Sequence, residues 1–144
     1  MTVHRQESTA NDRRFFEIIS FADTYAKDNK LEILFPAHPR VKQLIDGYQN
    51  TSTFRFIEPL SYLETQYVIS KAKAVLTDSG GLQKEAYFHQ VPCITLRSET
   101  EWLETIENGW NKLWTKKEYN KRITIDDYGQ GDCAKKIMGI LAQI

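Results

Sequence analysis

Cysteine is scarce in this chain. Only Cys93 and Cys133 occur among the 144 residues, with no Cys-x-x-Cys pair and no cysteine–histidine spacing that would build a zinc site. We therefore expect both thiols to be reduced and structural, and we expect no metal ion or other cofactor.

An excess of charge of either sign is also missing. Lys and Arg together number 19, as do Asp and Glu, so the formal net charge is zero. Nonspecific binding to nucleic acid or to an anionic membrane depends on excess Lys and Arg. The sequence argues against both partners, and any phosphate must be bound by a local cluster of donors.

Long apolar runs are absent too. No run approaches the about 20 residues that are needed to cross a bilayer. The first residues, Met-Thr-Val-His-Arg, lack the apolar centre of a signal peptide. We expect a cytoplasmic protein without a membrane segment.

The chain does contain a regular alternation of short apolar runs with longer segments of helical period. Its length and its 41% hydrophobic residues suit one domain with a substantial core. The alternation predicts an α/β domain, a doubly wound parallel sheet with helices on both faces. We expect strands at 31–35, 54–57, 74–76, 93–96 and 112–114, and helices near 11–28, 39–48, 61–71, 80–89, 100–108 and 132–143.

The first expected strand is unusually short. Only Thr2, Val3 and His4 precede the first long helix, and a domain of this kind seldom begins with such a stub. We expect residues 1–144 to form a single domain that is a piece of a longer protein.

The strongest signal for a binding site is Thr-Asp-Ser-Gly-Gly at 77–81, where a buried strand ends and a helix begins. Unpaired N–H groups and the helix dipole favour an anion at such a place. Gly80 and Gly81 let a pyrophosphate approach the backbone, Ser79 can donate its hydroxyl, and Glu85 can accept ribose hydroxyls one turn further on. Alternatively, the acid and the serine merely cap the helix and the glycines permit a tight turn.

Other polar residues follow strands at the same edge of the predicted sheet. His4 and Arg5 follow the first strand, His38 follows the second in Phe-Pro-Ala-His-Pro, and Arg97 follows the strand that begins at Cys93. Ligands bind at this edge in open α/β sheets, and these side chains suit phosphates and sugar hydroxyls. The alternatives are a solvated pair for the first two residues and a backbone hydrogen bond for His38.

The segment after Arg97 also allows two interpretations. Thr100 and Glu101 either touch a nucleotide or cap the next helix, with a capping box at Thr100 as the plainer reading.

The order and spacing of these motifs resemble one family. His-Arg-x-Glu, Phe-Pro-x-His-Pro, Ile-Glu-Pro-Leu-x-Tyr-Leu, Thr-Asp-Ser-Gly-Gly-x-Gln-x-Glu and Leu-Arg-x-x-Thr-Glu resemble the C-terminal half of the non-hydrolysing UDP-N-acetylglucosamine 2-epimerases. The resemblance runs from His4 to about Asn111. It implies a Rossmann-like domain, the second of two in a glycosyltransferase-B-type architecture, with the N-terminal domain missing.

The resemblance also implies roles in binding a UDP-sugar. The Ser-Gly-Gly turn would hold the diphosphate, the helix glutamate the ribose, and a loop near the uracil would contact the base, while a histidine faces the reacting sugar. Bacterial members also hold a second UDP-sugar as an activator. By position these roles fall on Ser79, Gly80, Gly81 and Arg97 for the diphosphate, Glu85 for the ribose, Leu60 for the base, His4 for catalysis, and Arg5 with His38 for the activator.

The reaction implied by the resemblance inverts carbon 2 of the sugar. UDP is eliminated to give a 2-acetamidoglucal and is then added back with the proton delivered to the other face. Donors aimed at the diphosphate stabilise the charge that develops on it. The family's acid and base carboxylates lie on the N-terminal domain, so we expect this chain to be inactive alone and the full-length form to be a homodimer.

Some positions depart from the family pattern. Ser8 replaces an asparagine, Lys84 replaces an acid, and Trp102-Leu103 replaces Arg-Pro. The last change resembles members that act on modified sugars such as UDP-2,3-diacetamido uronic acids, which stay an alternative to UDP-N-acetylglucosamine. Half of a glycosyltransferase and a stand-alone UDP-binding module are further alternatives, although Gln83 favours the epimerase.

Overall fold

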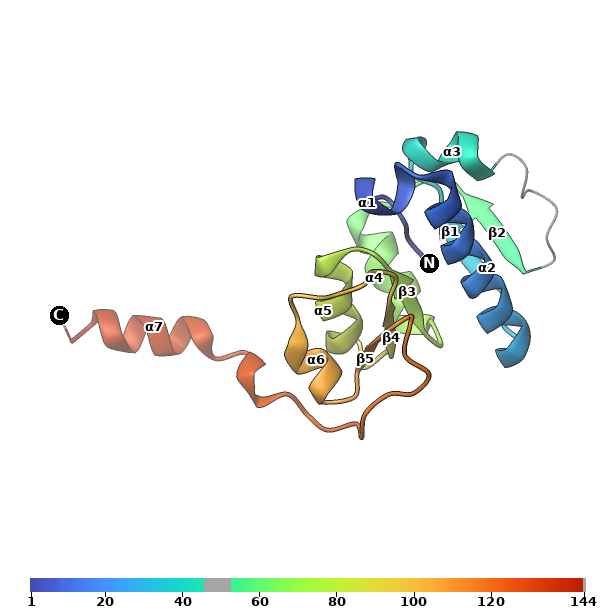
Figure 1. Ribbon diagram of the computed structural model, residues 1–144. Coiled ribbons are helices and arrows are strands. Elements are labelled where there is room, and N and C mark those ends of the chain that lie inside the picture. The colour runs from blue at the N-terminus through green and yellow to red at the C-terminus, as the bar shows by residue number, and fades with distance from the viewer. Residues whose placement is uncertain (46–52, 144) are drawn as a thin grey trace.

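The computed structural model describes residues 1–45 and 53–143 and confirms the α/β class (Figure 1). The five strands expected from 31 to 114 and the six expected helices are present with shifted ends, although residues 46–48 of one helix lie outside the described residues; the short strand expected at residues 2–4 is not formed. The strands are β1 (Ile33–Pro36), β2 (Phe54–Ile57), β3 (Val75–Thr77), β4 (Cys93–Thr95) and β5 (Asn111–Leu113). The helices are α1 (Gln6–Thr9), α2 (Asp12–Asn29), α3 (Pro39–Ile45), α4 (Tyr62–Lys71), α5 (Gly80–Phe88), α6 (Leu103–Glu107), the 3₁₀ helix η2 (Asp126–Tyr128) and α7 (Cys133–Leu141).

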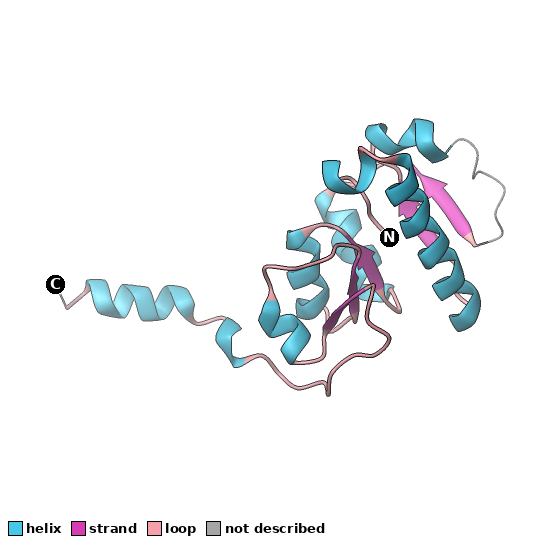
Figure 2. Cartoon of the chain, in the orientation of Figure 1, coloured by secondary structure: helices cyan, strands magenta, loops and turns pink. Residues whose placement is uncertain are grey.

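The strands are parallel and fall into two hydrogen-bonded groups rather than one continuous ladder (Figure 2). One group has the order β1-β2 and the other β3-β4-β5. The N-terminal residues lie between them: Thr2 forms a parallel bridge with Thr77, and the Met1 amino group donates to the Leu34 carbonyl at 2.7 Å. The expected first strand is thus reduced to one bridge with β3 and one hydrogen bond from the chain terminus to β1.

Helices cover both faces of the strands, as the sequence predicts. Successive strand residues point to opposite faces. Leu76 and Ile94 pack in one core cluster with α2, whereas Val75 and Cys93 pack in a second cluster with α4 and α5. The alternation within β3 and β4 therefore produces the doubly wound arrangement.

The apolar stripe of α2 is buried as expected. Phe15, Ile18, Ile19, Ala22 and Ala26 are 0% exposed. Burial of each large side chain among them contributes about 1.5–3 kcal/mol. This stripe anchors the first core cluster and so fixes the segment that carries His4 beside β3.

Some local expectations are wrong. The short helix α1 has no counterpart in the sequence prediction, and α6 begins only at Leu103. The capping box at Thr100, one of two interpretations of that segment, is absent because the helix begins at Leu103 with Trp102 as its N-cap residue. The Thr100 hydroxyl accepts the Trp102 N–H at 3.1 Å and donates to the Gln83 side chain at 2.6 Å. Cys93 is buried as a structural residue should be, but Cys133 is exposed at the start of α7.

The C-terminal helix α7 projects away from the rest of the chain (Figure 1). Ile137, Met138, Ile140 and Leu141 on this helix are all more than half exposed. In the described part of the chain, no helix combines the length and the apolarity needed to cross a membrane.

Candidate functional site

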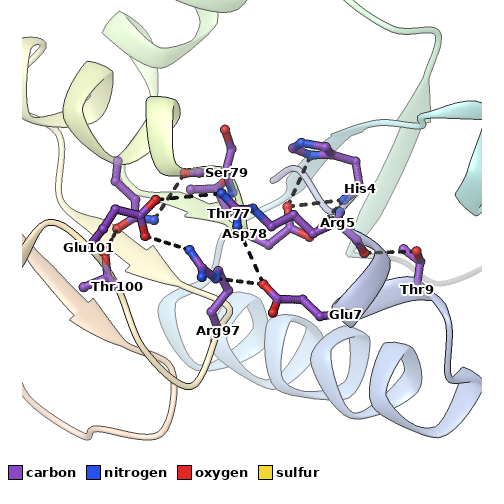
Figure 3. A network of polar contacts seen from close by, with 11 residues as sticks. His4, Arg5, Glu7, Thr9, Thr77, Asp78, Ser79, Arg97, Thr100 and Glu101 are labelled. Carbon is purple, nitrogen blue, oxygen red and sulfur yellow. Dashed lines mark hydrogen bonds and ion pairs between the residues drawn. The ribbon is translucent and has the colours of Figure 1, made fainter.

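Several candidate residues lie at the carboxyl ends of the strands, and Figure 3 shows His4, Arg5, Ser79 and Arg97 in one network of polar contacts. His4 follows the bridged N-terminal segment, His38 follows β1 and Leu60 follows β2, and all three line a mostly apolar cavity of about 210 Å³. The rings of His4 and His38 lie 6.2 Å apart, centroid to centroid. Ser79 and Arg97 follow β3 and β4 at the same edge.

The start of α5 differs from an ordinary capped helix. Ser79 is the N-cap residue, yet its side chain makes no capping hydrogen bond. The carboxylate of Asp78 is committed elsewhere, because it accepts the backbone N–H groups of His4 and Arg5 at 3.0 and 2.9 Å. The interpretation that these two residues merely cap the helix is therefore wrong, and the Ser79 hydroxyl remains available to a ligand.

The two glycines of α5 are not required by backbone conformation, since neither has a positive φ. A Cβ on Gly80 would collide with Glu101 Oε1 and lie 3.4 Å from Trp102 Nε1. A Cβ on Gly81 would meet only the Ser79 hydroxyl, at 4.0 Å. Gly80 is thus explained by the side chains packed against it, whereas Gly81 faces open space that a ligand can fill.

Two arginines lie close to this turn, and both are paired with carboxylates. Arg97 contacts Glu101 at 2.8 Å and Glu7 at 2.9 Å. Arg5 lies 3.8 Å from Glu101 and 3.9 Å from Glu7. The Arg97 side chain is only 12% exposed, while that of Glu101 is 44% exposed. We call Arg5, Glu7, Arg97 and Glu101 the charged quartet.

The pKa values of Arg97 and Glu101 are shifted from their ordinary values. Burial opposes the charge of Arg97, but the neighbouring Glu101 and Glu7 carboxylates together outweigh it and raise the pKa of the guanidinium. The pKa of Glu101 is lowered, chiefly by a hydrogen bond from its own backbone N–H and then by Arg97. The ligand-free site therefore holds fixed charges of both signs whose sum is zero.

Glu85 lies further along α5 and faces α4. Its carboxylate accepts a hydrogen bond from Gln66 Nε2 at 2.7 Å, and Gln66 Oε1 in turn lies 2.8 Å from His89 Nε2. Glu85 is not part of the charged quartet. It stands one helical turn from Gly81, as the sequence predicts.

A buried polar network supports the site from behind. Gln83 Oε1 accepts from the Thr100 hydroxyl and, at 3.0 Å, from Asn111 Nδ2. Asn111 Oδ1 also accepts from the Thr95 hydroxyl at 3.0 Å. Buried amide groups need hydrogen-bond partners within the protein. Here those partners connect α5 to the segment that carries Glu101. Sequence reasoning missed this network, and the only signal for it is polar residues within otherwise apolar runs.

Comparison with known proteins links this geometry to one family. A family model described as UDP-N-acetylglucosamine 2-epimerase matches residues 1–142. A UDP-N-acetylglucosamine 2-epimerase homolog of Methanococcus maripaludis is 38% identical, with 99% of this chain and 44% of the relative covered. The UDP-2,3-diacetamido-2,3-dideoxy-D-glucuronate 2-epimerase of Pseudomonas aeruginosa is 33% identical with the same coverage. The chain thus spans less than half the length of these relatives.

Solved structures agree with these matches. The UDP-GlcNAc 2-epimerase of Methanocaldococcus jannaschii superposes with a TM-score of 0.86 at 33% identity, covering 99% of this chain and 45% of that chain. A complex of the same enzyme with UDP-GlcNAc and UDP gives a TM-score of 0.82 at 32% identity, covering 99% and 44%. The match falls on the C-terminal half of these enzymes.

Proposed function

Since this chain belongs to the UDP-N-acetylglucosamine 2-epimerase family, we propose that it is the nucleotide-binding half of a UDP-amino-sugar 2-epimerase. The observation that carries the proposal is the convergence of two arginines on a helix N-terminus whose N-cap hydroxyl is uncommitted. Backbone N–H groups, a hydroxyl and guanidinium groups are the donors that a diphosphate requires.

In this proposal the diphosphate binds at the start of α5. The Ser79 hydroxyl and the N–H groups of Gly80 and Gly81 donate to it, and Arg97 supplies charge. To reach the phosphates, Arg97 exchanges a carboxylate partner for a phosphate oxygen. Support comes from the open space in front of Gly81, which leaves room for close approach.

The rest of the nucleotide extends away from this turn. Glu85 accepts the ribose hydroxyls, and Leu60 at the mouth of the cavity contacts the base. Leu60 and His4 line the same cavity, which supports a path from the base to the reacting sugar. Arg5 and His38 stay predictions as an activator site, and so do the homodimer and the cytoplasmic location.

The chain contributes electrostatic stabilisation to the reaction rather than the whole of it. Elimination of UDP places negative charge on the departing diphosphate, and preorganised donors at the Ser-Gly-Gly turn stabilise that charge. His4 faces the diphosphate and sugar. The acid and base that move the carbon 2 proton belong to a separate N-terminal domain in this proposal.

The named relatives bear on the sugar. The Methanococcus and Methanocaldococcus relatives are named for UDP-N-acetylglucosamine, and we propose this sugar first. The uronate-specific name of the Pseudomonas relative keeps the modified sugar as a second candidate. That candidate is favoured by Trp102, since Trp102-Leu103 in place of Arg-Pro resembles members that act on modified sugars. Lys84, which stands where the family has an acid, lies beside it, with Nζ 4.1 Å from the centre of the Trp102 ring.

Calorimetric titration with UDP and with uridine tests the proposal. We expect weak UDP binding, because a cleft built from two domains offers one wall here. Ser79→Ala and Arg97→Ala should weaken UDP by about tenfold or more while leaving uridine unchanged, since charge-assisted hydrogen bonds contribute about 1.5–3 kcal/mol.

Two exposed residues outside the site provide controls. Ser70→Ala on α4 and Arg55→Ala on β2 remove the same chemical groups and should leave UDP affinity unchanged. A folded wild-type chain that shows no heat with UDP at millimolar concentration would contradict the proposed function.

A further inference from the structure

The side chain of Asp78 is 0% exposed, and its partners cannot be predicted from the sequence. Oδ2 accepts the backbone N–H groups of His4 and Arg5, at 3.0 and 2.9 Å. Oδ1 lies 3.2 Å from the ring Nδ1 of His4 (Figure 3). All these partners come from a segment more than 70 residues earlier in the chain.

The 3.2 Å contact between Asp78 Oδ1 and the His4 ring indicates which ring nitrogen carries a proton. Backbone N–H groups can only donate, so both oxygens of Asp78 act as acceptors: Oδ2 for His4 and Arg5, and Oδ1 for the His4 N–H at 3.3 Å. An ionised carboxylate can only accept. A close contact between such an oxygen and a ring nitrogen requires that nitrogen to carry the hydrogen. The neutral His4 ring is therefore the Nδ1–H form.

The other ring nitrogen, Nε2, is consequently the one that can contact a ligand. With the hydrogen of the neutral ring on Nδ1, Nε2 carries the lone pair that can accept a hydrogen bond. The His4 side chain is 42% exposed and lines the cavity mouth at the carboxyl edge. A ligand at that edge meets Nε2 rather than Nδ1.

We propose that Asp78 is a positioning residue that holds the Nδ1–H form of His4 and thereby presents Nε2 to the diphosphate and sugar. The identity of that ligand rests on the proposed function, but the choice of tautomer does not. One carboxylate thus has two tasks: both oxygens hold the backbone N–H groups of the turn, and Oδ1 also orients the ring.

Asp78→Asn is the informative variant because it keeps the size of the side chain. If the Asn oxygen keeps the two backbone N–H groups, its NH₂ group faces His4 and can only donate. The ring nitrogen must then accept, and the proton moves to Nε2. The same logic underlies the loss of the correct tautomer when a triad aspartate becomes asparagine.

The test is a long-range ¹H–¹⁵N correlation spectrum of the ligand-free 144-residue chain with ¹⁵N-labelled histidine rings, at alkaline pH. His4→Gln identifies the signals of His4 among the three histidines. We expect a dominant Nδ1–H form in the wild type and a dominant Nε2–H form in Asp78→Asn. The rings of His38 and His89 should not change.

Thr2→Val is the matched control. The Thr2 hydroxyl lies 2.7 Å from that of Thr77 and also ties the N-terminal segment to β3, without touching the His4 ring. This variant should keep the Nδ1–H form. A switch of tautomer in Thr2→Val would show that the ring merely responds to loosening of the segment.

A wild-type His4 that is mainly Nε2–H, or an unchanged tautomer in folded Asp78→Asn, would overturn the proposal. If Asp78→Asn does not fold, the wild-type and Thr2→Val spectra decide alone. UDP added to the wild type should shift the Nε2 signal of His4 more than the Nδ1 signal, and the reverse would refute the presented atom. A chain with the expected tautomer but no UDP binding would refute the proposed function only.

Discussion

Glu101 occupies the position that a phosphate would take beside the two arginines. Its carboxylate lies against Gly80 at the start of α5 and pairs with Arg97 and Arg5. Binding of a diphosphate must therefore displace this carboxylate or share the arginines with it. We predict that Glu101→Gln, which keeps the shape and removes the charge, strengthens UDP binding.

The size of the effect follows from the exposure of the pair. Arg97 and Glu101 are 2.8 Å apart and four residues apart in sequence, and the Glu101 side chain is 44% exposed. Exposed pairs of this kind contribute about 0.2–1 kcal/mol. Removing the competing charge should lower the dissociation constant of UDP by about 1.4- to fivefold. Uridine lacks phosphates and should bind as before.

The assay is calorimetric titration at low ionic strength, because salt screens exposed charges. Glu17→Gln is the matched control: Glu17 is 46% exposed and pairs with Arg13 at the same i,i+4 spacing on α2. UDP binding that weakens in Glu101→Gln would mean that the carboxylate contacts the nucleotide favourably. An unchanged affinity would mean that Glu101 does not compete with the diphosphate.

Further predictions concern the ribose, the glycine turn, the amino terminus and turnover. Glu85→Gln should weaken uridine and UDP alike, and unchanged uridine affinity would remove Glu85 from the ribose site. Gly81→Ala should stabilise the ligand-free chain by up to about 1 kcal/mol in urea denaturation, since alanine favours helix, yet weaken UDP; equal UDP affinity would argue against close approach. Burial lowers the pKa of the Met1 amino group from 8.0 to about 5. The charged amine is disfavoured in the folded state, so the free energy of unfolding is highest above pH 8 and should fall by at most about 4 kcal/mol as the pH drops to 5. An N-acetylated chain should lack this pH dependence. If the dependence survives acetylation, it arises from other groups. In deuterated water the isolated chain should not exchange the carbon 2 hydrogen of UDP-N-acetylglucosamine, because binding alone does not lower a barrier; incorporation lost in His4→Ala, measured by mass spectrometry, would show that this half carries its own acid and base.

The edge of the site could be predicted because it depends on topology. Buried runs that end in Ser79 and in Arg97 must place those residues at one edge once the strands are parallel. The same rule brought His4 and His38 together, whose rings lie 6.2 Å apart. Strand periodicity and connection length are local properties, so sequence reasoning was sufficient for this part.

Partners distant in sequence could not be predicted. The sequence does not predict the ion pair between Glu7 and Arg97, since this contact depends on how the N-terminal segment packs beside β3. Asp78 is read as a helix cap from local rules, yet its partners stand more than 70 residues away. The sequence thus locates the candidate residues, but the state of each one in the ligand-free site depends on three-dimensional packing.

In the proposed function, the charged quartet balances the charges around the diphosphate site. Two guanidinium groups beside a helix N-terminus would repel one another if nothing neutralised them. The carboxylates of Glu101 and Glu7 neutralise these positive charges. They also hold in place the side chain of Arg97, which is only 12% exposed. A diphosphate then replaces one anion with another while the donors stay in place. Little reorganisation is needed at that moment, which is the condition under which fixed donors stabilise developing charge most effectively.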